Sequence, residues 1–184
     1  MSKKHKLLAF VGMSGSGKSI GTDYLASQGW TKIYFGGVTY DKMREAGIEI
    51  TLENETEFRE QLRKDYGMGA YAIFLLDQIK EAYAKGDTVL DGLYTWEELK
   101  ILRKEFGDNL NLIAVVVDRK LRYERFNQRK ERSYMANQIE SRDIREIEYL
   151  DKGGPIAMAD YYIYNDDDKE AYIKRLNEII ASIE

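Results

Sequence analysis

Residues 12–19 constrain the fold of this chain more than any other segment. Their sequence, Gly-Met-Ser-Gly-Ser-Gly-Lys-Ser, fits the pattern G-x-x-x-x-G-K-[ST] and directly follows the apolar run 7–11. A buried strand, a glycine-rich turn and the start of a helix form the setting in which this pattern binds phosphate. Backbone N–H groups point into one concavity there, at a helix N-terminus whose dipole attracts anions. The segment therefore predicts a nucleotide-binding loop.

Two side chains of this loop have expected roles. Lys18 should reach the β- and γ-phosphate oxygens, and Ser19 should ligate Mg²⁺. Asp91, at the end of the apolar strand 88–91, is a second expected Mg²⁺ ligand, although it could instead be a turn or N-cap residue before Gly92. The residues expected to contact the nucleotide are Gly12, Ser14, Gly15, Ser16, Gly17, Lys18, Ser19 and Ile20.

Length and composition predict one domain that spans residues 1–184. With 43% hydrophobic residues, 184 residues can bury one good core. The chain has no cysteine, which excludes disulfides and thiolate sites and agrees with a cytoplasmic location. The apolar run 7–11 is too short for a membrane helix. A net charge of −4 makes nucleic acid an unlikely partner.

Hydrophobic patterning alternates between strands and helices along the whole chain. Strands are expected at 7–11, 33–35, 88–91, 112–117 and 161–164, and helices at about 18–28, 40–46, 54–66, 70–84, 96–105, 119–132, 136–150 and 168–183. Thr95 and Glu98 form a predicted capping box, whereas Gly153-Gly154-Pro155 is expected to be a tight connection. This alternation predicts an α/β fold in which a five-stranded parallel sheet has helices on both faces. With the loop at residues 12–19, the expected fold is of the three-layer P-loop NTPase type.

The predicted strand ends bring several distant segments to one edge of the sheet. These are Gly12–Ser19, Gly36–Arg44, Asp91–Thr95 and Asp118–Arg132. The residues that carry a resemblance to a known family are Gly12–Ser19, Phe35-Gly36-Gly37, Met43-Arg44, Asp91-Gly92, Arg125, Arg129, Ser141-Arg142-Asp143 and the segment 153–160. Over nearly its whole length the chain resembles the nucleoside-monophosphate-kinase-like branch of P-loop proteins. It is most similar to the adenylate-kinase-related, dephospho-CoA-kinase-like proteins of archaea and some bacteria. The resemblance implies ATP and Mg²⁺ as cofactors.

The resemblance also implies a lid at about residues 129–141. Arg125 would flank the adenine and Arg129 would contact the phosphates, while Arg132 and Arg142 would close from the far side. With Lys18, these last three arginines are the expected catalytic residues, since phosphoryl transfer needs positive charge around the transferred group. Alternatively, helical spacing makes the basic residues of 119–132 a solvated face. Asn165 would contact the base by the resemblance, or else residues 165–168 together cap the final helix.

The acceptor site is expected in the helical segment at about 36–84. Arg44 lies where relatives contact a monophosphate, and Thr95 replaces the arginine that adenylate-kinase-type enzymes use for this purpose. Gly37 stands where dephospho-CoA kinases have an aspartate that can act as a base toward a hydroxyl. Five residues are the predicted substrate contacts: Arg44, Arg59, Arg63, Asp41 as a substitute base, and Tyr94 as part of an aromatic pocket with Tyr40, Tyr66, Tyr71 and Tyr134.

These observations predict an ATP-dependent phosphotransferase that acts on a nucleoside monophosphate or a related small nucleotide. A dephospho-CoA-kinase-like enzyme that phosphorylates a hydroxyl is the alternative within this class. Two alternatives from other classes stay open. One is a nucleotide-responsive regulatory ATPase or binding module, and the other is a polynucleotide-end kinase or other nucleic-acid binder that uses residues 119–132.

Overall fold

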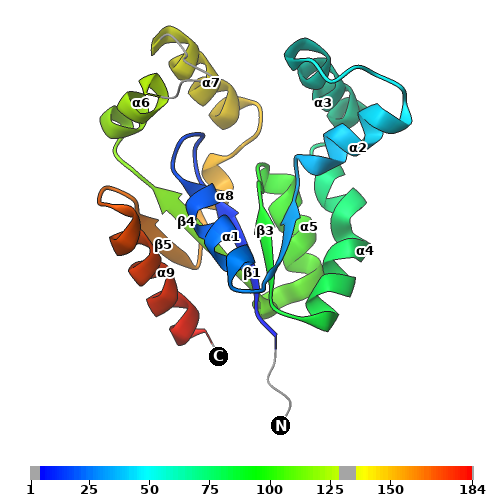
Figure 1. Cartoon of the computed structure of the whole chain (residues 1–184). Helices are drawn as coiled ribbons and strands as arrows, with labels where there is room; N and C mark the ends of the chain where they lie inside the picture. Colours follow the sequence, from blue (N-terminus) through cyan, green and yellow to red (C-terminus); the bar gives the residue numbers. More distant parts are fainter. Residues whose placement is uncertain (1–4, 129–135, 184) are drawn as a thin grey trace.

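A computed structural model of the chain describes residues 5–128 and 136–183, except for the side chains of residues 52, 136 and 137. Within these residues, five parallel strands form one sheet in the order β2-β3-β1-β4-β5 (Figure 1). The strands are β1 (Leu7–Val11), β2 (Thr31–Tyr34), β3 (Thr88–Asp91), β4 (Leu110–Val116) and β5 (Tyr161–Tyr164). The predicted five-stranded parallel sheet is confirmed.

Helices cover both faces of this sheet, as predicted. They are α1 (Lys18–Ser27), α2 (Gly37–Glu45), α3 (Leu52–Tyr66), α4 (Ala70–Lys85), α5 (Trp96–Phe106), α6 (Arg119–Asn127), α7 (Ala136–Glu148), α8 (Gly153–Ala157) and α9 (Lys169–Ser182). A 3₁₀ turn, Gly107–Asn109, precedes β4. The helices α4 and α5 pack on one face, and α1 and α9 pack on the other.

The central strand β1 explains why the sheet is covered twice. All five of its residues are fully buried. Leu7, Ala9 and Val11 belong to the core beneath α4 and α5, whereas Leu8 and Phe10 belong to the core beneath α1 and α9. Successive side chains of a strand point to opposite faces, so a continuous apolar run needs an apolar layer on each side.

One predicted connection is wrong, because residues 153–157 form the short helix α8. Pro155 is compatible with this helix because its position in the first turn needs no backbone N–H. The backbone of Gly154 lies against the ring of Trp96, where a Cβ atom would come within 2.8 Å. The packing of this segment on α5 selects a helical turn that local sequence patterns do not indicate.

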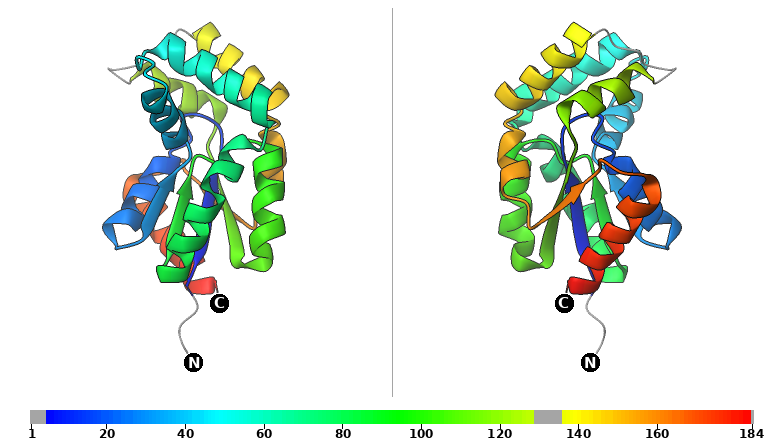
Figure 2. Two further views of the ribbon diagram at one scale, coloured as in Figure 1. Left: turned by 90° about the vertical axis from the view of Figure 1, so that its right-hand side faces the viewer. Right: turned by 90° about the vertical axis from the view of Figure 1, so that its left-hand side faces the viewer.

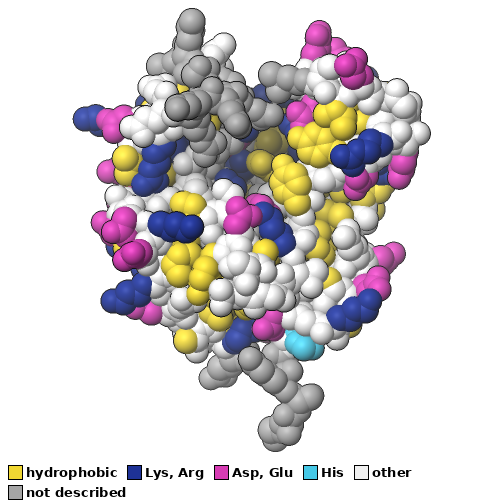
Figure 3. All heavy atoms as spheres, viewed as in Figure 1, with side chains coloured by type: hydrophobic (Ala, Val, Ile, Leu, Met, Phe, Trp, Pro, Cys, Tyr) yellow, Lys and Arg dark blue, Asp and Glu magenta, His cyan; other side chains and the backbone are white. Residues whose placement is uncertain are grey.

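Two pairs of helices rise above the carboxyl edge of the sheet, α2 with α3 on one side and α6 with α7 on the other (Figures 1 and 2). The space-filling view is hollowed between these pairs, and hydrophobic side chains gather on the α2–α3 side of the hollow (Figure 3). Over the described ranges, no helix is long and apolar enough to cross a bilayer.

Candidate active site

The predicted nucleotide-binding loop, residues 12–19 and hereafter the P-loop, connects β1 to α1. Gly17 is the N-cap of α1 and has φ +94°, a conformation that glycine adopts without strain. Asn165 donates a hydrogen bond from Nδ2 to the Ser16 carbonyl oxygen (2.7 Å). A Cβ atom at position 17 would lie 2.2 Å from this Nδ2 atom. Gly17 is therefore required both by the turn and by the close approach of Asn165.

The same contact defines the role of Asn165 in this structure. Its side chain is buried, and its backbone N–H donates to the Val116 carbonyl oxygen (2.8 Å). Asn165 thus fastens the P-loop to the ends of β4 and β5. It does not cap the final helix, because Asp168 is the N-cap of α9 and accepts from the Ala171 N–H (2.9 Å). A contact of Asn165 with the base stays a prediction.

Lys18 points back onto its own loop. Its Nζ atom donates to the carbonyl oxygens of Gly12 (2.8 Å) and Met13 (3.1 Å). Burial, together with the positive charge of nearby Lys152, lowers the pKa of Lys18 to about 7. Anionic phosphates beside this amine would favour its charged form. The residue is therefore placed to gain both charge and partners when a nucleotide enters the loop.

Asp91 lies at the end of β3, next to β1 in the sheet and beside the P-loop. Its Oδ2 atom accepts from Thr22 Oγ1 (3.1 Å) and is 2.9 Å from Lys32 Nζ. The Ser19 hydroxyl and the Asp91 carboxylate are oxygen donors of the kind that Mg²⁺ prefers. In the described ranges no group of three or more His, Cys, Asp or Glu residues could hold a metal by itself. The donor set therefore fits a Mg²⁺ ion that takes its other ligands from nucleotide phosphates and water.

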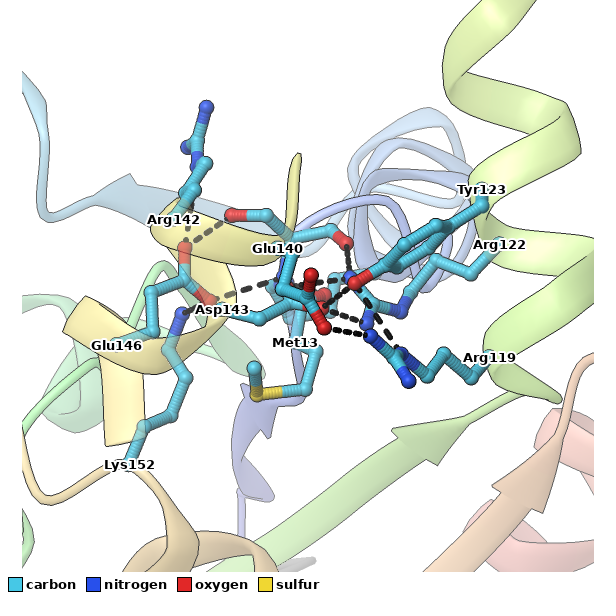
Figure 4. A network of polar contacts seen from close by, with 11 residues as sticks. Met13, Arg119, Arg122, Tyr123, Glu140, Arg142, Asp143, Glu146 and Lys152 are labelled. Atoms are coloured by element: carbon cyan, nitrogen blue, oxygen red, sulfur yellow. Dashed lines mark hydrogen bonds and ion pairs between the residues drawn. The ribbon is translucent and has the colours of Figure 1, made fainter. Parts of the chain in front are cut away.

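A buried carboxylate contacts the other half of the P-loop. Glu146, on α7, accepts from the Ser14 backbone N–H (3.1 Å) and from its hydroxyl, from Lys152 Nζ (2.7 Å) and from Arg142 Nε (3.3 Å). Figure 4 shows Glu146 with the side chains of Arg142 and Lys152. Burial acts to raise the pKa of Glu146, but Lys152, Ser14 and Arg142 outweigh it and lower the pKa to about 2. Sequence patterns indicate neither Glu146 nor Lys152.

An ion pair between Arg122 on α6 and Asp143 on α7, both labelled in Figure 4, also contacts Ser14 of the P-loop. Arg122 forms two hydrogen bonds with the Asp143 carboxylate, one of them 2.7 Å long between Nη1 and Oδ1. The same Nη1 atom donates to the Ser14 carbonyl oxygen (3.0 Å), and Tyr123 donates its hydroxyl proton to Asp143 (3.0 Å). Arg122 is thus buried within the protein, although its helical spacing alone would also suit a solvated face.

A cavity of about 390 Å³ opens between α2, α3 and α7, and its lining includes Glu146, which contacts Ser14 of the P-loop. We call it the acceptor cavity. It is rich in arginine and tyrosine, and its lining residues are Tyr34, Phe35, Gly36, Tyr40, Thr56, Arg59, Arg63, Tyr71, Tyr94, Arg142, Arg145, Glu146 and Leu150. Three of the tyrosines expected in an aromatic pocket line it, namely Tyr40, Tyr71 and Tyr94. Tyr66 is 56% exposed and does not line the cavity, and Tyr134 lies outside the described residues.

The arginines of the acceptor cavity differ in their surroundings. Arg63 lies over the Tyr71 ring, 5.0 Å from its centroid, and its buried Nε atom has no hydrogen-bond partner in the described part of the chain. Arg59 pairs with Glu55, and Arg145 pairs with Glu60. Of these three, Arg145 was not predicted, although it follows Arg142 by about one turn of α7, a spacing that places two residues on one helix face.

Other predicted residues lie elsewhere. Arg44 and Asp41 form an ion pair with each other (2.9 Å), have side chains that are 65% and 69% exposed, and do not line the acceptor cavity. Ile20 packs against the core beneath α1 and α9. The Nη1 atom of Arg125 is buried without a hydrogen-bond partner among residues 5–128 and 136–183. Arg129 and Arg132, and with them the predicted lid up to residue 135, lie outside the described residues.

Comparisons with known proteins agree with this geometry. The sequence pattern of a family described as an AAA domain matches residues 8–151. A UPF0200 protein of Thermococcus onnurineus is 30% identical over 181 residues, which cover 96% of this chain and 97% of that protein.

Two solved kinases have a similar structure. A shikimate kinase from Bacteroides thetaiotaomicron has a TM-score of 0.60 at 12% identity, covering 96% of this chain and 98% of its own. A dephospho-CoA kinase from Campylobacter jejuni has a TM-score of 0.57 at 13% identity, covering 98% of both chains. At these identities the likeness shows the fold alone. The chain therefore has a P-loop kinase-like fold and belongs to the AAA domain family, together with the UPF0200 proteins.

Proposed function

We propose that this protein is an ATP-dependent phosphotransferase whose acceptor is a nucleoside monophosphate or a closely related nucleotide. The observation that supports this most is the acceptor cavity beside the P-loop, which has four arginines and four tyrosines in its lining. Arginine binds phosphate oxygens through its planar fork, and tyrosine rings pack against planar bases. A nucleotide has both groups, a phosphate for the arginines and an aromatic base for the tyrosines.

The proposed reaction needs little covalent chemistry from the protein. An oxygen of the acceptor phosphate bonds to the γ-phosphorus as the bond to the β,γ-bridging oxygen breaks, and ADP leaves with the electron pair of that bond. Lys18 and Arg142 offset the negative charge of the transferred group. Bound Mg²⁺, held by Ser19 and Asp91, would supply further positive charge at the phosphates. The P-loop backbone orients the donor by hydrogen bonds from its N–H groups.

A phosphate acceptor also fits the acidic residues that the structure describes in and near the cavity. A phosphate oxygen is already ionised at neutral pH, whereas attack by a hydroxyl is helped by a base that removes its proton. Asp41, the predicted substitute base, is in an exposed ion pair with Arg44 outside the cavity. Among the described residues that line the cavity, Glu146 is the one acid, and it is a weak base while Lys152, Ser14 and Arg142 hold its pKa low. The cavity thus favours phosphate over a hydroxyl.

The test is an assay of ADP release from ATP in the presence of each candidate acceptor. Common nucleoside and deoxynucleoside monophosphates, dephospho-CoA and shikimate would be compared at equal concentration. We expect stimulation by at least one monophosphate and none by shikimate. Stimulation by dephospho-CoA alone would show that the acceptor is a hydroxyl, and no stimulation by any compound would contradict the proposal.

A further inference from the structure

The contacts of Glu146 have the chemistry of an anion-binding site. One carboxylate accepts from a P-loop backbone N–H, a hydroxyl, an ammonium group and a guanidinium group, which belong to Ser14, Lys152 and Arg142. Backbone N–H groups of a P-loop ordinarily bind phosphate oxygens. In this structure one of them binds an internal carboxylate instead.

The carboxylate of Glu146 lies between the P-loop and the acceptor cavity. Glu146 contacts the P-loop at Ser14, and it also lines the acceptor cavity. A phosphoryl group that moves from a nucleotide in the loop to an acceptor in the cavity has to cross this boundary. The anion subsite, which we define as Ser14, Arg142 and Lys152, lies at that crossing.

Lys152 is an unusual residue in this subsite because its side chain is completely buried. Its Nζ atom lies 2.7 Å from Glu146 and 4.1 Å from the centroid of the Tyr94 ring. It is also close enough to Lys18 for the two positive charges to repel each other. Burying an ammonium group is costly unless a negative charge accompanies it. Glu146 supplies that charge while the loop holds no phosphate.

We propose that Ser14, Arg142 and Lys152 bind the transferred phosphoryl group, with Lys152 as a further catalytic residue, and that Glu146 occupies their subsite until ATP displaces it. This inference rests on the proposed function. In this exchange one anion takes the place of another beside the same cations, and the γ-phosphate brings the larger negative charge. ADP lacks the γ-phosphate, so it would leave Glu146 in place. Glu146 would therefore oppose the binding of ATP but not of ADP.

Equilibrium binding of ATP and ADP to purified variants tests this inference. Glu146→Gln keeps the shape of the side chain and removes its charge. We expect it to bind ATP about tenfold more tightly than the wild type and ADP within about twofold, since a charge-assisted contact no longer competes with the γ-phosphate. Lys152→Met keeps most of the side-chain volume and removes the ammonium group. We expect it to bind ATP about tenfold more weakly, again with ADP within about twofold.

Matched controls use the same two substitutions away from the site. Glu81 and Lys85 form an exposed ion pair on α4 (2.6 Å). Glu81→Gln and Lys85→Met should leave both affinities within about twofold of the wild type. Circular dichroism and thermal unfolding would show whether each variant folds. If Lys152→Met does not fold, the ratio of ATP to ADP affinity in Glu146→Gln decides the question alone.

The possible outcomes separate the two proposals. If the substitutions at positions 146 and 152 change ATP and ADP affinity in parallel, or change neither, the pair only stabilises the fold and the anion subsite is disproved. The proposed function would still stand, because the wild type would bind nucleotide. If the wild type binds neither ATP nor ADP, both the proposed function and the inference are overturned.

Discussion

The P-loop and the acceptor cavity are neighbours, but they are built in different ways. The P-loop is one run of eight residues between β1 and α1, so its geometry follows from local turns and from the start of a helix. The acceptor cavity takes its lining from β2, α2, α3, α4, α7 and the segment after β3, which are distant in sequence. A donor site of this kind can thus be found from a motif, whereas the acceptor site depends on how separate helices pack together.

The largest effect on turnover is expected from Lys18→Met, which changes the donor site and leaves the acceptor cavity intact. Removing the charge at the transferred phosphoryl group should lower turnover by about a thousandfold or more. Initial rates of ADP formation would measure the loss. Turnover that stays within tenfold of the wild type would show that the P-loop is not the reacting site.

Lys18→Met should lower turnover but raise the stability of the protein, by an amount that depends on pH. The pKa of Lys18 is about 7 in the folded protein and 10.5 as the ordinary value, so between these pH values the unfolded state binds more protons. Wild-type stability should therefore rise with pH across this window. Lys18→Met should exceed the wild type in stability most clearly below pH 7, and the difference should shrink toward pH 10. Urea unfolding at pH 6, 8 and 10 would measure it, and a difference independent of pH would contradict the prediction.

Asp143→Asn tests how the P-loop is attached to α6 and α7. It removes one partner of the buried pair with Arg122 and leaves that guanidinium without its counter-charge. We expect a loss of about 3 kcal/mol in the free energy of unfolding, measured with urea. Glu140→Gln is the matched control, because its pair with Arg119 is exposed and should contribute less than about 1 kcal/mol. Equal losses of unfolding free energy in the two variants would contradict the expectation that the buried ion pair contributes more than the exposed one.

Arg63→Gln changes the acceptor cavity and leaves the P-loop intact. Its buried Nε atom has no hydrogen-bond partner among the described residues, so an acceptor phosphate would be a suitable partner. We expect KM for the acceptor to rise about tenfold with little change in KM for ATP. Steady-state kinetics with each substrate varied in turn would measure both.

Two further variants serve as controls for Arg63→Gln. Lys64→Gln changes the next residue of α3, which is exposed, and should leave both KM values unchanged. Arg44→Gln changes an arginine in an exposed pair outside the cavity. A rise in acceptor KM for Arg44→Gln as large as that for Arg63→Gln would show that α2 moves toward the acceptor during the reaction.

The smallest effect is expected from Thr95→Ala. Thr95 caps α5 by accepting from the Glu98 N–H (3.1 Å), and its hydroxyl donates to the Met68 carbonyl oxygen (2.7 Å). Its loss should cost about 1 kcal/mol of stability and leave acceptor KM within about twofold. Thermal unfolding and kinetics would measure the two quantities. A large rise in acceptor KM would show that Thr95 replaces the phosphate-binding arginine of adenylate-kinase-type enzymes in function as well as in position.

Several elements could be predicted because their causes are local. The capping box of Thr95 and Glu98 depends on residues three apart, and both of its hydrogen bonds are present. The buried run of β1 and the alternation of strands and helices predict the parallel sheet. Arg59, Arg63 and Tyr94 line the acceptor cavity, as their place near the predicted acceptor segment suggested. Their contact with an acceptor stays a prediction.

Other features depend on contacts that no local pattern encodes. Glu146 meets Ser14 across 132 residues of sequence, and Asn165 meets Ser16 across 149. Arg122 looks like part of a solvated basic face until Asp143 is placed beside it by the packing of α7 on α6.

The sheet, the P-loop and the edge at which the site lies thus follow from the sequence alone, because continuous apolar runs and a contiguous motif act over short distances. Which charged residues are buried together at that edge depends on the tertiary structure. A buried charge is stable only with a partner, and the partners of Arg122 and Lys152, Asp143 and Glu146, both lie on α7, which folding places beside the P-loop.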